Sequence, residues 1–155
     1  MPVTAKALTV ARLGLADRDA WATMRLALWP DQPLQELTDE IAPMVATRDF
    51  AAFGARAPDG RWLGMVEIGA RSVAEGCVTT PVGYIEALWV DASVRRQGVA
   101  RRLVEAATAW SREQGYRELA SDTTIANRLS QEVHRKLGFT ETERLVTFRK
   151  DLRRP

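Results

Sequence analysis

Apolar residues recur along this chain with two periods, which predict alternating strands and helices. Runs that alternate with polar residues, or are apolar throughout, predict six strands, at Leu8–Leu13, Phe50–Arg56, Trp62–Arg71, Tyr84–Val90, Arg117–Ser121 and Arg144–Lys150. Apolar residues three or four positions apart predict four helices, at Asp17–Leu28, Glu36–Thr47, Gly98–Gln114 and Asn127–Leu137. The order of these elements predicts an α/β sandwich around a mixed central β-sheet.

Prolines and turn residues mark the ends of several elements. Pro30 ends the first helix, and Pro43 should kink or divide the second, because proline has no backbone N–H to donate. Pro58-Asp59-Gly60 predicts a hairpin between the second and third strands. Since we find neither an internal repeat nor a linker, we expect a single domain over residues 1–155.

The segment Val94–Arg101 is the strongest indication of chemistry. It follows the apolar strand that ends at Val90 and opens the helix predicted from Gly98. The first turn of a helix presents unpaired N–H groups and partial positive charge, which suit a pyrophosphate, and a glycine there lets a ligand approach the backbone. Four arginines add formal positive charge: Arg95, Arg96, Arg101 and Arg102. The alternative is a solvated basic helix start, because a single glycine is weaker than a three-glycine nucleotide fingerprint.

Charge is distributed unevenly along the chain. The net charge of +2 does not suggest nucleic acid, no apolar run is long enough to cross a bilayer, and the N-terminus lacks a signal peptide's pattern, so we expect a cytoplasmic protein. Residues 30–49 hold five acids and one base, whereas residues 95–112 hold five arginines and one acid. This separation favours an anionic cofactor and a cationic substrate, unless these charges only solvate helix faces.

The cysteine and histidine content argues against disulfide and metal chemistry. Cys77 is the only cysteine, so an internal disulfide is impossible and a reducing compartment is expected. Cys77 has no base near it in sequence, and we expect it to be inert. With a single histidine, His134, the chain lacks the ligands of a zinc site, so no metal is expected.

Two carboxylates occupy positions where a charge needs a reason. Glu86 lies inside an apolar strand, and strand alternation places Glu86 and Leu88 on the face opposite Ile85, Ala87 and Trp89. Asp122 follows the next strand, at the carboxyl edge where α/β proteins usually build their sites. The alternatives are an ion pair or an exposed sheet face for Glu86, and a helix cap for Asp122.

The segment Arg95-x-x-Gly98-x-Ala100 resembles the acetyl-CoA signature of the GNAT family of N-acetyltransferases, Arg/Gln-x-x-Gly-x-Gly/Ala. The order of elements is similar to the GNAT fold from end to end. The resemblance implies a mixed central sheet flanked by four helices, with splayed fourth and fifth strands, here Tyr84–Val90 and Glu118–Ser121. The pantetheine arm of acetyl-CoA would insert between them and pair with their free backbone groups. The cofactor-binding residues implied are Leu88, Trp89, Val90, Arg95, Arg96, Gln97, Gly98, Val99, Ala100, Arg101 and Asn127, although Asn127 also suits a helix cap.

The last third of the chain closely resembles one GNAT subgroup, the aminoglycoside 6′-N-acetyltransferases. The narrowest pieces are Ser121-Asp122-Thr123 and Glu141-Thr142-Glu143-Arg144, and Leu28-Trp29-Pro30 matches upstream. The resemblance implies a dimeric, antibiotic-modifying enzyme that acetylates the 6′-amine. Two alternatives stay open: an acetyltransferase for another polyamine or a protein N-terminus, and a non-catalytic CoA-binding module.

Acetyl transfer to an amine requires a neutral amine, a stabilised carbonyl oxygen and a departing thiolate. Presenting an amine of pKa about 9 in its neutral form at pH 7 costs roughly 2.7 kcal/mol, which a carboxylate acting through a water can supply. The expected catalytic residues are Glu86, Asp122 and His134. His134 stands where the family usually has a tyrosine that protonates the thiolate; the alternative is a histidine hydrogen-bonded within its helix.

A polycationic acceptor requires several carboxylates, each making charge-assisted hydrogen bonds. Glu86 and Asp122 would hold the reacting ring, and Trp29 either packs on a sugar face or closes the core. The loop Ser72–Gly76 lacks the tyrosine of close relatives, and Glu75 offers a charge instead. The remaining substrate-binding expectations are Asp31, Glu36, Asp39 and Glu40 along the outer rings, with Glu141 and Glu143 reaching a partner subunit's site.

Overall fold

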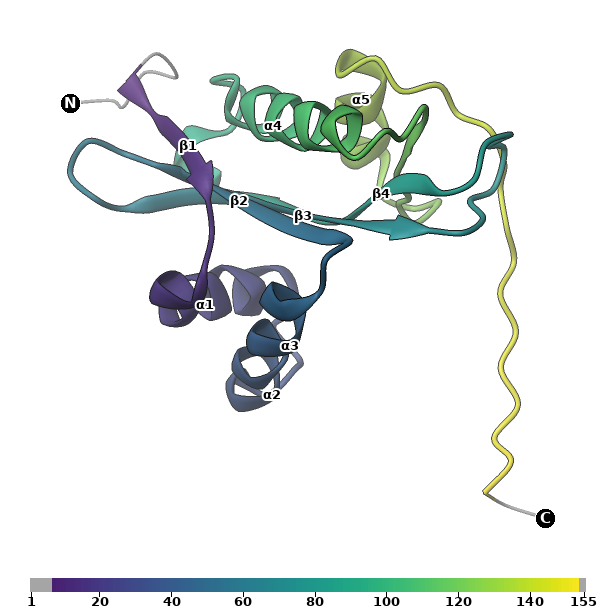
Figure 1. The fold of residues 1–155 in the computed structure, drawn as a ribbon, viewed down its shortest axis with the longest axis horizontal. Coiled ribbons are helices and arrows are strands. Elements are labelled where there is room, and N and C mark those ends of the chain that lie inside the picture. The colour runs from purple at the N-terminus through teal and green to yellow at the C-terminus, as the bar shows by residue number, and fades with distance from the viewer. Residues whose placement is uncertain (1–6, 154–155) are drawn as a thin grey trace. The chain divides into compact units, whose positions relative to one another are not determined.

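The computed structural model describes residues 7–153 of the chain (Figure 1). The chain consists of two compact units, Met1–Asp122 and Thr123–Pro155. The first unit contains a sheet and the helices that cover it, and the second contains one helix and an extended segment.

The sheet of the first unit has five strands in chain order, β1-β2-β3-β4-β5. The first four are antiparallel neighbours, and β5 runs parallel to β4, so the sheet is mixed as expected. The bounds are β1 Thr9–Arg12, β2 Phe50–Arg56, β3 Trp62–Arg71, β4 Val82–Val90 and β5 Leu119–Ala120. Both β2 and β3 have the predicted bounds, because the Pro58-Asp59-Gly60 turn and the apolar runs on either side of it agree.

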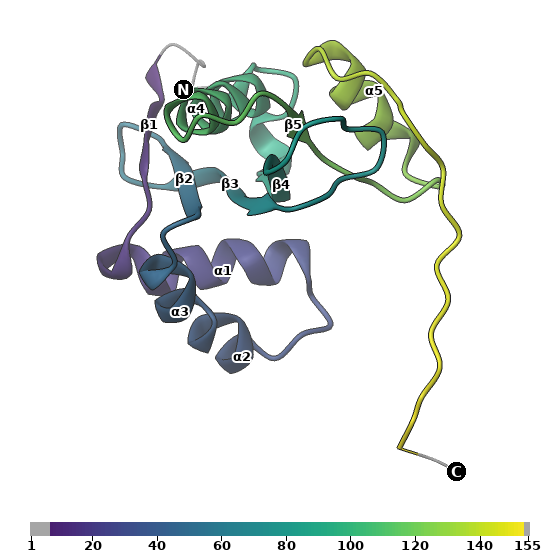
Figure 2. The ribbon, with the colours of Figure 1, turned by 45° about the vertical axis from the view of Figure 1, so that its right-hand side comes forward.

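Helices cover both faces of this sheet (Figure 1 and Figure 2). On one face lie α1 (Arg18–Leu28), α2 (Leu34–Asp39) and α3 (Ile41–Ala46), and on the other lies α4 (Val99–Glu113). The apolar stripe of α4 is buried against β2, β3 and β4, and α1 packs on β3 and β4. The core under α1 contains Trp21, Met24, Ile41, Met65 and Ala87. The structure therefore confirms the predicted α/β sandwich.

The helix predicted over Glu36–Thr47 is two helices, α2 and α3, which meet at Glu40. Pro43 lies in the first turn of α3, where a backbone N–H has no intrahelical acceptor, so its missing donor costs nothing there. The division that Pro43 suggested is confirmed.

The second unit contains α5 (Arg128–Lys136), close to the prediction, but the strand predicted at Arg144–Lys150 is wrong. A strand exists only where its backbone pairs with a neighbour, and in the part of the chain that the structure describes the sheet ends at β5. Residues 139–151 are extended without being assigned to a strand. Alternation of apolar residues alone cannot supply the partner.

A buried ion pair that the sequence analysis missed joins α1 to β3. Glu67 is 2% exposed, and one of its oxygens accepts hydrogen bonds from Trp21 Nε1 and Arg25 Nη1, each at 2.8 Å. Burial raises the pKa of the Glu67 carboxyl, and Arg25 and Trp21 oppose that shift. Arg25 also pairs with Glu40 and lies over the ring of Trp29, 5.0 Å from its centroid. This cluster fixes the position of α1 on the sheet.

Candidate active site

The strands β4 and β5 pair over only two positions, Gly83 with Leu119 and Tyr84 with Ala120. Beyond Tyr84, β4 continues to Val90, and among the described residues only β3 pairs with it there. The backbone groups on its other edge therefore need partners, which an amide-rich ligand can supply by lying along the strand. The splay of the fourth and fifth strands is confirmed, and the edge it leaves includes the predicted residues Leu88, Trp89 and Val90.

Glu86 lies at an irregularity in the pairing of β3 with β4. Ile85 faces Ile68 and Ala87 faces Glu67, so Glu86 is an extra residue on β4, as in a β-bulge. Glu67 and Ile68 are consecutive, so their side chains lie on opposite faces of the sheet. The side chains of their partners, Ala87 and Ile85, therefore also lie on opposite faces. The expectation that Ile85 and Ala87 share a face is wrong for this reason. The bulge leaves Glu86 exposed between two buried neighbours.

Arg71, at the end of β3, binds Glu86 through both carboxylate oxygens. The distances are 2.9 Å from Nε to Oε1 and 2.7 Å from Nη2 to Oε2. This two-bond geometry is the strong form of an arginine–carboxylate pair, although both side chains are more than a third exposed and solvent screens the attraction. The hydrogen bonds to Glu86 raise the pKa of the Arg71 guanidinium. The ion pair that the sequence left open for Glu86 is therefore present.

Asp122 and Tyr84 complete the group. Tyr84 Oη donates a hydrogen bond to Asp122 Oδ2 at 2.6 Å, and the Arg71 guanidinium lies over the Tyr84 ring, 3.5 Å from its centroid. Burial, followed by the hydrogen bond to Asp122, raises the pKa of the Tyr84 phenol, so it remains a donor. We call Arg71, Tyr84, Glu86 and Asp122 the two-carboxylate cluster. The fold thus brings the two predicted carboxylates to one place and adds two residues that sequence reasoning missed.

The turn before α4 has the geometry of an anion cradle. Gly98 is the N-cap of α4 with φ 83°, and Arg96 before it has φ 62°. The N–H of Arg102 donates to Gly98 O, one turn into the helix, so the amides of Val99 and Ala100 precede the first intrahelical hydrogen bonds. The side chains of Arg95, Arg96 and Arg101 are exposed around this end. A left-handed glycine, a helix N-terminus and three arginines fit the pyrophosphate of coenzyme A.

The predicted residues outside the cluster have varied surroundings in the first unit. Trp29 is half-buried against the core beneath α1 and stacks with Arg25, so its packing role is the one that the structure contains. Asp31 is exposed in the loop after α1, and Glu75 is exposed in the loop between β3 and β4. Glu40, expected to lie along the outer rings, is instead a partner of Arg25.

In the second unit, Asn127 and His134 belong to α5. Asn127 is the N-cap of this helix, and its side chain accepts a hydrogen bond from the N–H of Ser130 at 3.0 Å. His134 Nδ1 lies 2.7 Å from the Ser130 carbonyl oxygen, which can only accept, so Nδ1 carries the proton. Each residue therefore has the local structural role that the sequence left open, and the cap of α5 uses the side-chain oxygen of Asn127.

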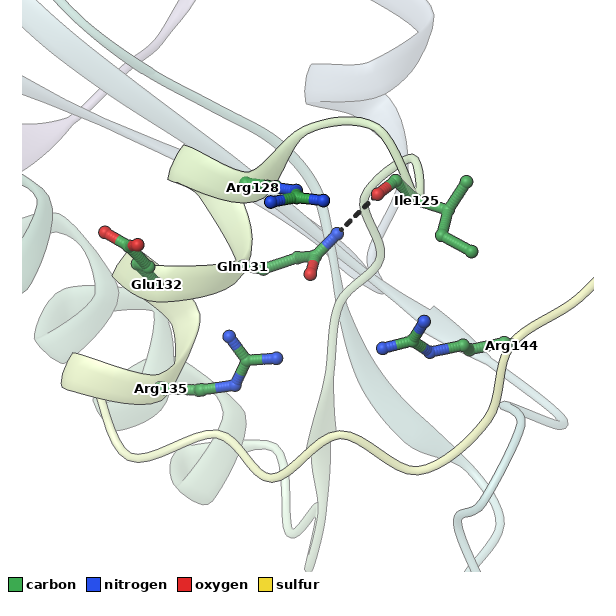
Figure 3. Close-up of a pocket in the computed structure, with 6 residues that line it drawn as sticks. All are labelled: Ile125, Arg128, Gln131, Glu132, Arg135 and Arg144. Carbon is green, nitrogen blue, oxygen red and sulfur yellow. Dashed lines mark hydrogen bonds between the residues drawn. The ribbon is translucent and has the colours of Figure 1, made fainter.

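One face of α5 borders an open pocket of about 450 Å³ (Figure 3). Its lining is Ile125, Arg128, Gln131, Glu132, Arg135 and Arg144. Glu141 pairs with two of these arginines, Arg135 at 3.0 Å and Arg144 at 2.6 Å. None of the expected catalytic or cofactor-binding residues lines this pocket.

The remaining chemistry of the described residues is limited. Burial, followed by the charge of Glu118, raises the pKa of the Cys77 thiol, which opposes formation of the reactive thiolate. Residues 7–153 contain no group of three histidine, cysteine or acidic side chains able to hold a metal ion. Among the helices of the same range, none is long and apolar enough to cross a membrane.

These features agree with comparisons to known proteins. Residues 17–139 match the acetyltransferase (GNAT) family, and the chain belongs to this family. Two similar proteins, both named aminoglycoside N(6′)-acetyltransferase type 1, come from Serratia marcescens (42% identical over 135 residues, 86% of this chain and 92% of that one) and Stenotrophomonas maltophilia (41% over 151 residues, 96% of each). The structure of AAC(6′)-Iy with the bisubstrate analogue CoA-S-monomethyl-acetylneamine is 34% identical, with a TM-score of 0.89, covering 93% of this chain and 98% of that one.

The chain is therefore an acetyl-CoA-dependent N-acetyltransferase of the GNAT fold. Acetyl-CoA is a co-substrate that supplies the acetyl group as a thioester. In this chain, the free edge of β4 and the turn before α4 are the two features that suit its pantetheine arm and its pyrophosphate.

Replacing Gly98 by Ala is expected to raise KM for acetyl-CoA about tenfold, a loss of roughly 1.4 kcal/mol of binding. A Cβ at φ 83° costs about 1–2 kcal/mol in the folded state, and we expect it to hinder the approach of a ligand to the backbone amides. The measurement is the initial rate against acetyl-CoA concentration at saturating acceptor. Gly115→Ala is the matched control, because Gly115 has φ 84° and open space around a Cβ. An equal rise in KM in both variants would contradict the expectation that the turn at Gly98 binds the pyrophosphate of coenzyme A.

Proposed function

We propose that this chain transfers acetyl from acetyl-CoA to the 6′-amine of aminoglycosides. The observation that carries the proposal is the two-carboxylate cluster beside the open edge of β4. Asp122 follows β5 and Glu86 lies on β4, and the splay of these two strands would admit the thioester arm. Relatives that are about 42% and 41% identical bear the name aminoglycoside N(6′)-acetyltransferase type 1, which supports this acceptor.

In the proposed reaction, the amine attacks the thioester directly. Asp122 accepts a hydrogen bond from the amine, and a carboxylate of the cluster takes its proton, directly or through a water. Leu88, Trp89 and Val90 provide the backbone edge. The pyrophosphate binds at Gln97 and Gly98, in the turn before α4, and at Val99 and Ala100, the first two residues of that helix. Asn127 contributes the amide N–H₂ that its helix cap does not use.

His134 is proposed as the group that protonates the departing thiolate. Because Nδ1 donates to the Ser130 carbonyl, a neutral His134 ring presents a lone pair at Nε2. His134 can then deliver a proton from Nε2 only as an imidazolium. A thiol of pKa about 8.5 is already a fair leaving group at neutral pH, so the contribution of His134 to the rate is expected to be small.

The outer rings of the acceptor are proposed to contact exposed acids and one aromatic surface. Asp31 and Glu75 lie in the loops after α1 and β3, and Trp29 offers the part of its ring that the core leaves exposed. Glu141 belongs to the second unit, where two arginines already partly neutralise it, so its contribution to a polycation is expected to be the weakest of these.

We also propose a cytoplasmic homodimer, with the extended C-terminal segment at its interface. Leu145, Val146, Phe148 and Leu152 are 60–94% exposed, and apolar groups gathered in this way usually mark a protein–protein contact.

Light scattering of the full chain is expected to give the mass of two chains, and Phe148→Ser is expected to shift the mass toward one. Val78→Ser is the control, because Val78 is 91% exposed but lies in another loop. A monomeric full chain would contradict the proposal.

The acceptor is tested with two aminoglycosides that differ only in carrying an amine or a hydroxyl at the 6′ position. Thiol release from acetyl-CoA is expected with the amine and not with the hydroxyl. Spermidine and a peptide with a free N-terminus test the two other acceptors. Thiol release with spermidine or the peptide, and not with the aminoglycoside, would overturn the proposed acceptor. Binding of acetyl-CoA without thiol release in the presence of any of these amines would indicate a CoA-binding module.

A further inference from the structure

The two carboxylates of the cluster have partners of different charge. Glu86 is bound on both oxygens by the Arg71 guanidinium, whereas Asp122 accepts a hydrogen bond from the neutral phenol of Tyr84. With both carboxylates ionised, the cluster carries one positive and two negative charges. Asp122 is therefore its uncompensated anion.

This difference bears on the protonation of the acceptor, given the proposed transfer to an amine. An amine attacks only when neutral, yet a carboxylate within about 4–6 Å favours the ammonium form and raises the amine's pKa by about one to three pH units. Each pH unit lowers the neutral fraction tenfold. Two uncompensated carboxylates would bind a cationic acceptor more tightly and would also keep it protonated. A cation beside one of them limits this penalty.

Arg71 is held where it can act in this way. Its guanidinium lies over the Tyr84 ring, at 3.5 Å from the centroid, and donates two hydrogen bonds to the Glu86 carboxylate. The groups that act electrostatically on it are Glu86, Tyr84 and Asp122. Glu86 is the extra residue of the bulge in β4, so the ion pair also determines where this carboxylate points.

We infer that Arg71 is a positioning residue that offsets the charge of Glu86, so that the bound acceptor amine experiences the uncompensated charge of Asp122 alone. Arg71 thereby weakens binding of the protonated acceptor and increases the neutral fraction of the bound amine. Tyr84 has the complementary role of orienting Asp122 without neutralising it.

The test is the pH profile of kcat for Arg71→Gln with a 6′-amino aminoglycoside. The acid limb is the part of this profile in which kcat rises with pH. We expect it to move up by about one pH unit, which is the lower end of the pKa shift that one nearby charge causes. At pH 7, kcat and KM for the acceptor should both fall about tenfold, leaving kcat/KM nearly unchanged, as happens when a substitution stabilises the ground state. Arg71→Lys keeps the positive charge but loses the two parallel hydrogen bonds to Glu86, and it should leave the acid limb in place.

Further variants separate charge from structure. Adding Glu86→Gln to Arg71→Gln should return the acid limb to its wild-type position, and Arg61→Gln, which breaks the exposed pair with Asp59 in the β2–β3 hairpin, should change nothing. If Arg71→Gln does not fold, Glu86→Gln is the reciprocal test, because it should move the acid limb down in pH. A fall in kcat/KM with an unmoved acid limb would overturn the inference.

Wild-type thiol release distinguishes this inference from the proposed function on which it rests. If the wild-type chain acetylates another amine and not an aminoglycoside, the proposed acceptor fails, and the same comparison of variants is made with that amine. If the wild-type chain acetylates the aminoglycoside and the acid limbs of Arg71→Gln and wild type coincide, only the inference fails.

Discussion

Asp122→Asn is expected to lower kcat/KM for acetylation of an aminoglycoside about a hundred- to ten-thousandfold, the range for removing a positioned acid–base group. The substitution is close in shape, and an amide oxygen still accepts the hydrogen bond that Tyr84 donates at 2.6 Å. What it removes is the negative charge, because Glu86 remains paired with Arg71. The measurement is the rate of thiol release at subsaturating acceptor, with the thermal midpoint of each protein recorded in parallel.

Asp59→Asn is the matched control for this loss. Asp59 is an exposed carboxylate in the β2–β3 hairpin and also pairs with an arginine, Arg61. Its replacement removes one negative charge without touching the strand pair that carries the site. A similar fall in both variants would assign the effect to net charge, and an Asp122→Asn variant with wild-type kcat/KM would remove Asp122 from the reaction.

The second large effect is on stability. Arg25→Ala is expected to lower the free energy of unfolding by about 3–5 kcal/mol, because it leaves the Glu67 carboxylate buried without its cation. Glu67 is 2% exposed and would keep the hydrogen bond from Trp21, whose indole carries no charge. Urea unfolding followed by tryptophan fluorescence measures the change, with the slope of the transition checked for constancy.

Two comparisons test the origin of this loss. Arg18→Ala removes an arginine from the same helix whose ion pair with Asp19 is exposed, and it should change the stability by no more than about 0.5 kcal/mol. Arg25→Ala combined with Glu67→Gln should lose less than the sum of the single variants, because the buried charge is gone. Additive losses would mean that the two side chains stabilise the fold independently.

Features that depend on neighbouring residues were predicted well from the sequence. The bounds of β2 and β3 agree with prediction, because a strand, a turn and a second strand are consecutive and their signals reinforce one another. The turn at Gly98 was predicted as an anion-binding site for the same reason: its glycine, its helix N-terminus and its arginines lie within eight residues. Glu86 could be selected from the sequence as a candidate site residue because its charge interrupts an apolar strand.

Features that depend on register and pairing were not predicted. Arg71 and Glu86 meet across two strands, and the contact depends on an extra residue in β4 that alternation cannot reveal. Tyr84 and Asp122 are 38 positions apart and meet because β5 pairs in parallel with the start of β4. The strand expected at Arg144–Lys150 was wrong for the opposite reason: its apolar pattern is present, but within residues 7–153 no strand pairs with it.

The sequence by itself determined the α/β class and the order of the elements as far as α5, and it predicted the turn at Gly98 and the two carboxylates as site residues. Each of these follows from local periodicity or from side-chain chemistry along a short stretch. The tertiary structure alone decided which cation neutralises Glu86, which hydroxyl orients Asp122 and how Arg25 and Glu67 join helix to sheet. Those contacts join residues 15 to 42 positions apart, and only the registered packing of strands and helices brings such residues within hydrogen-bonding distance.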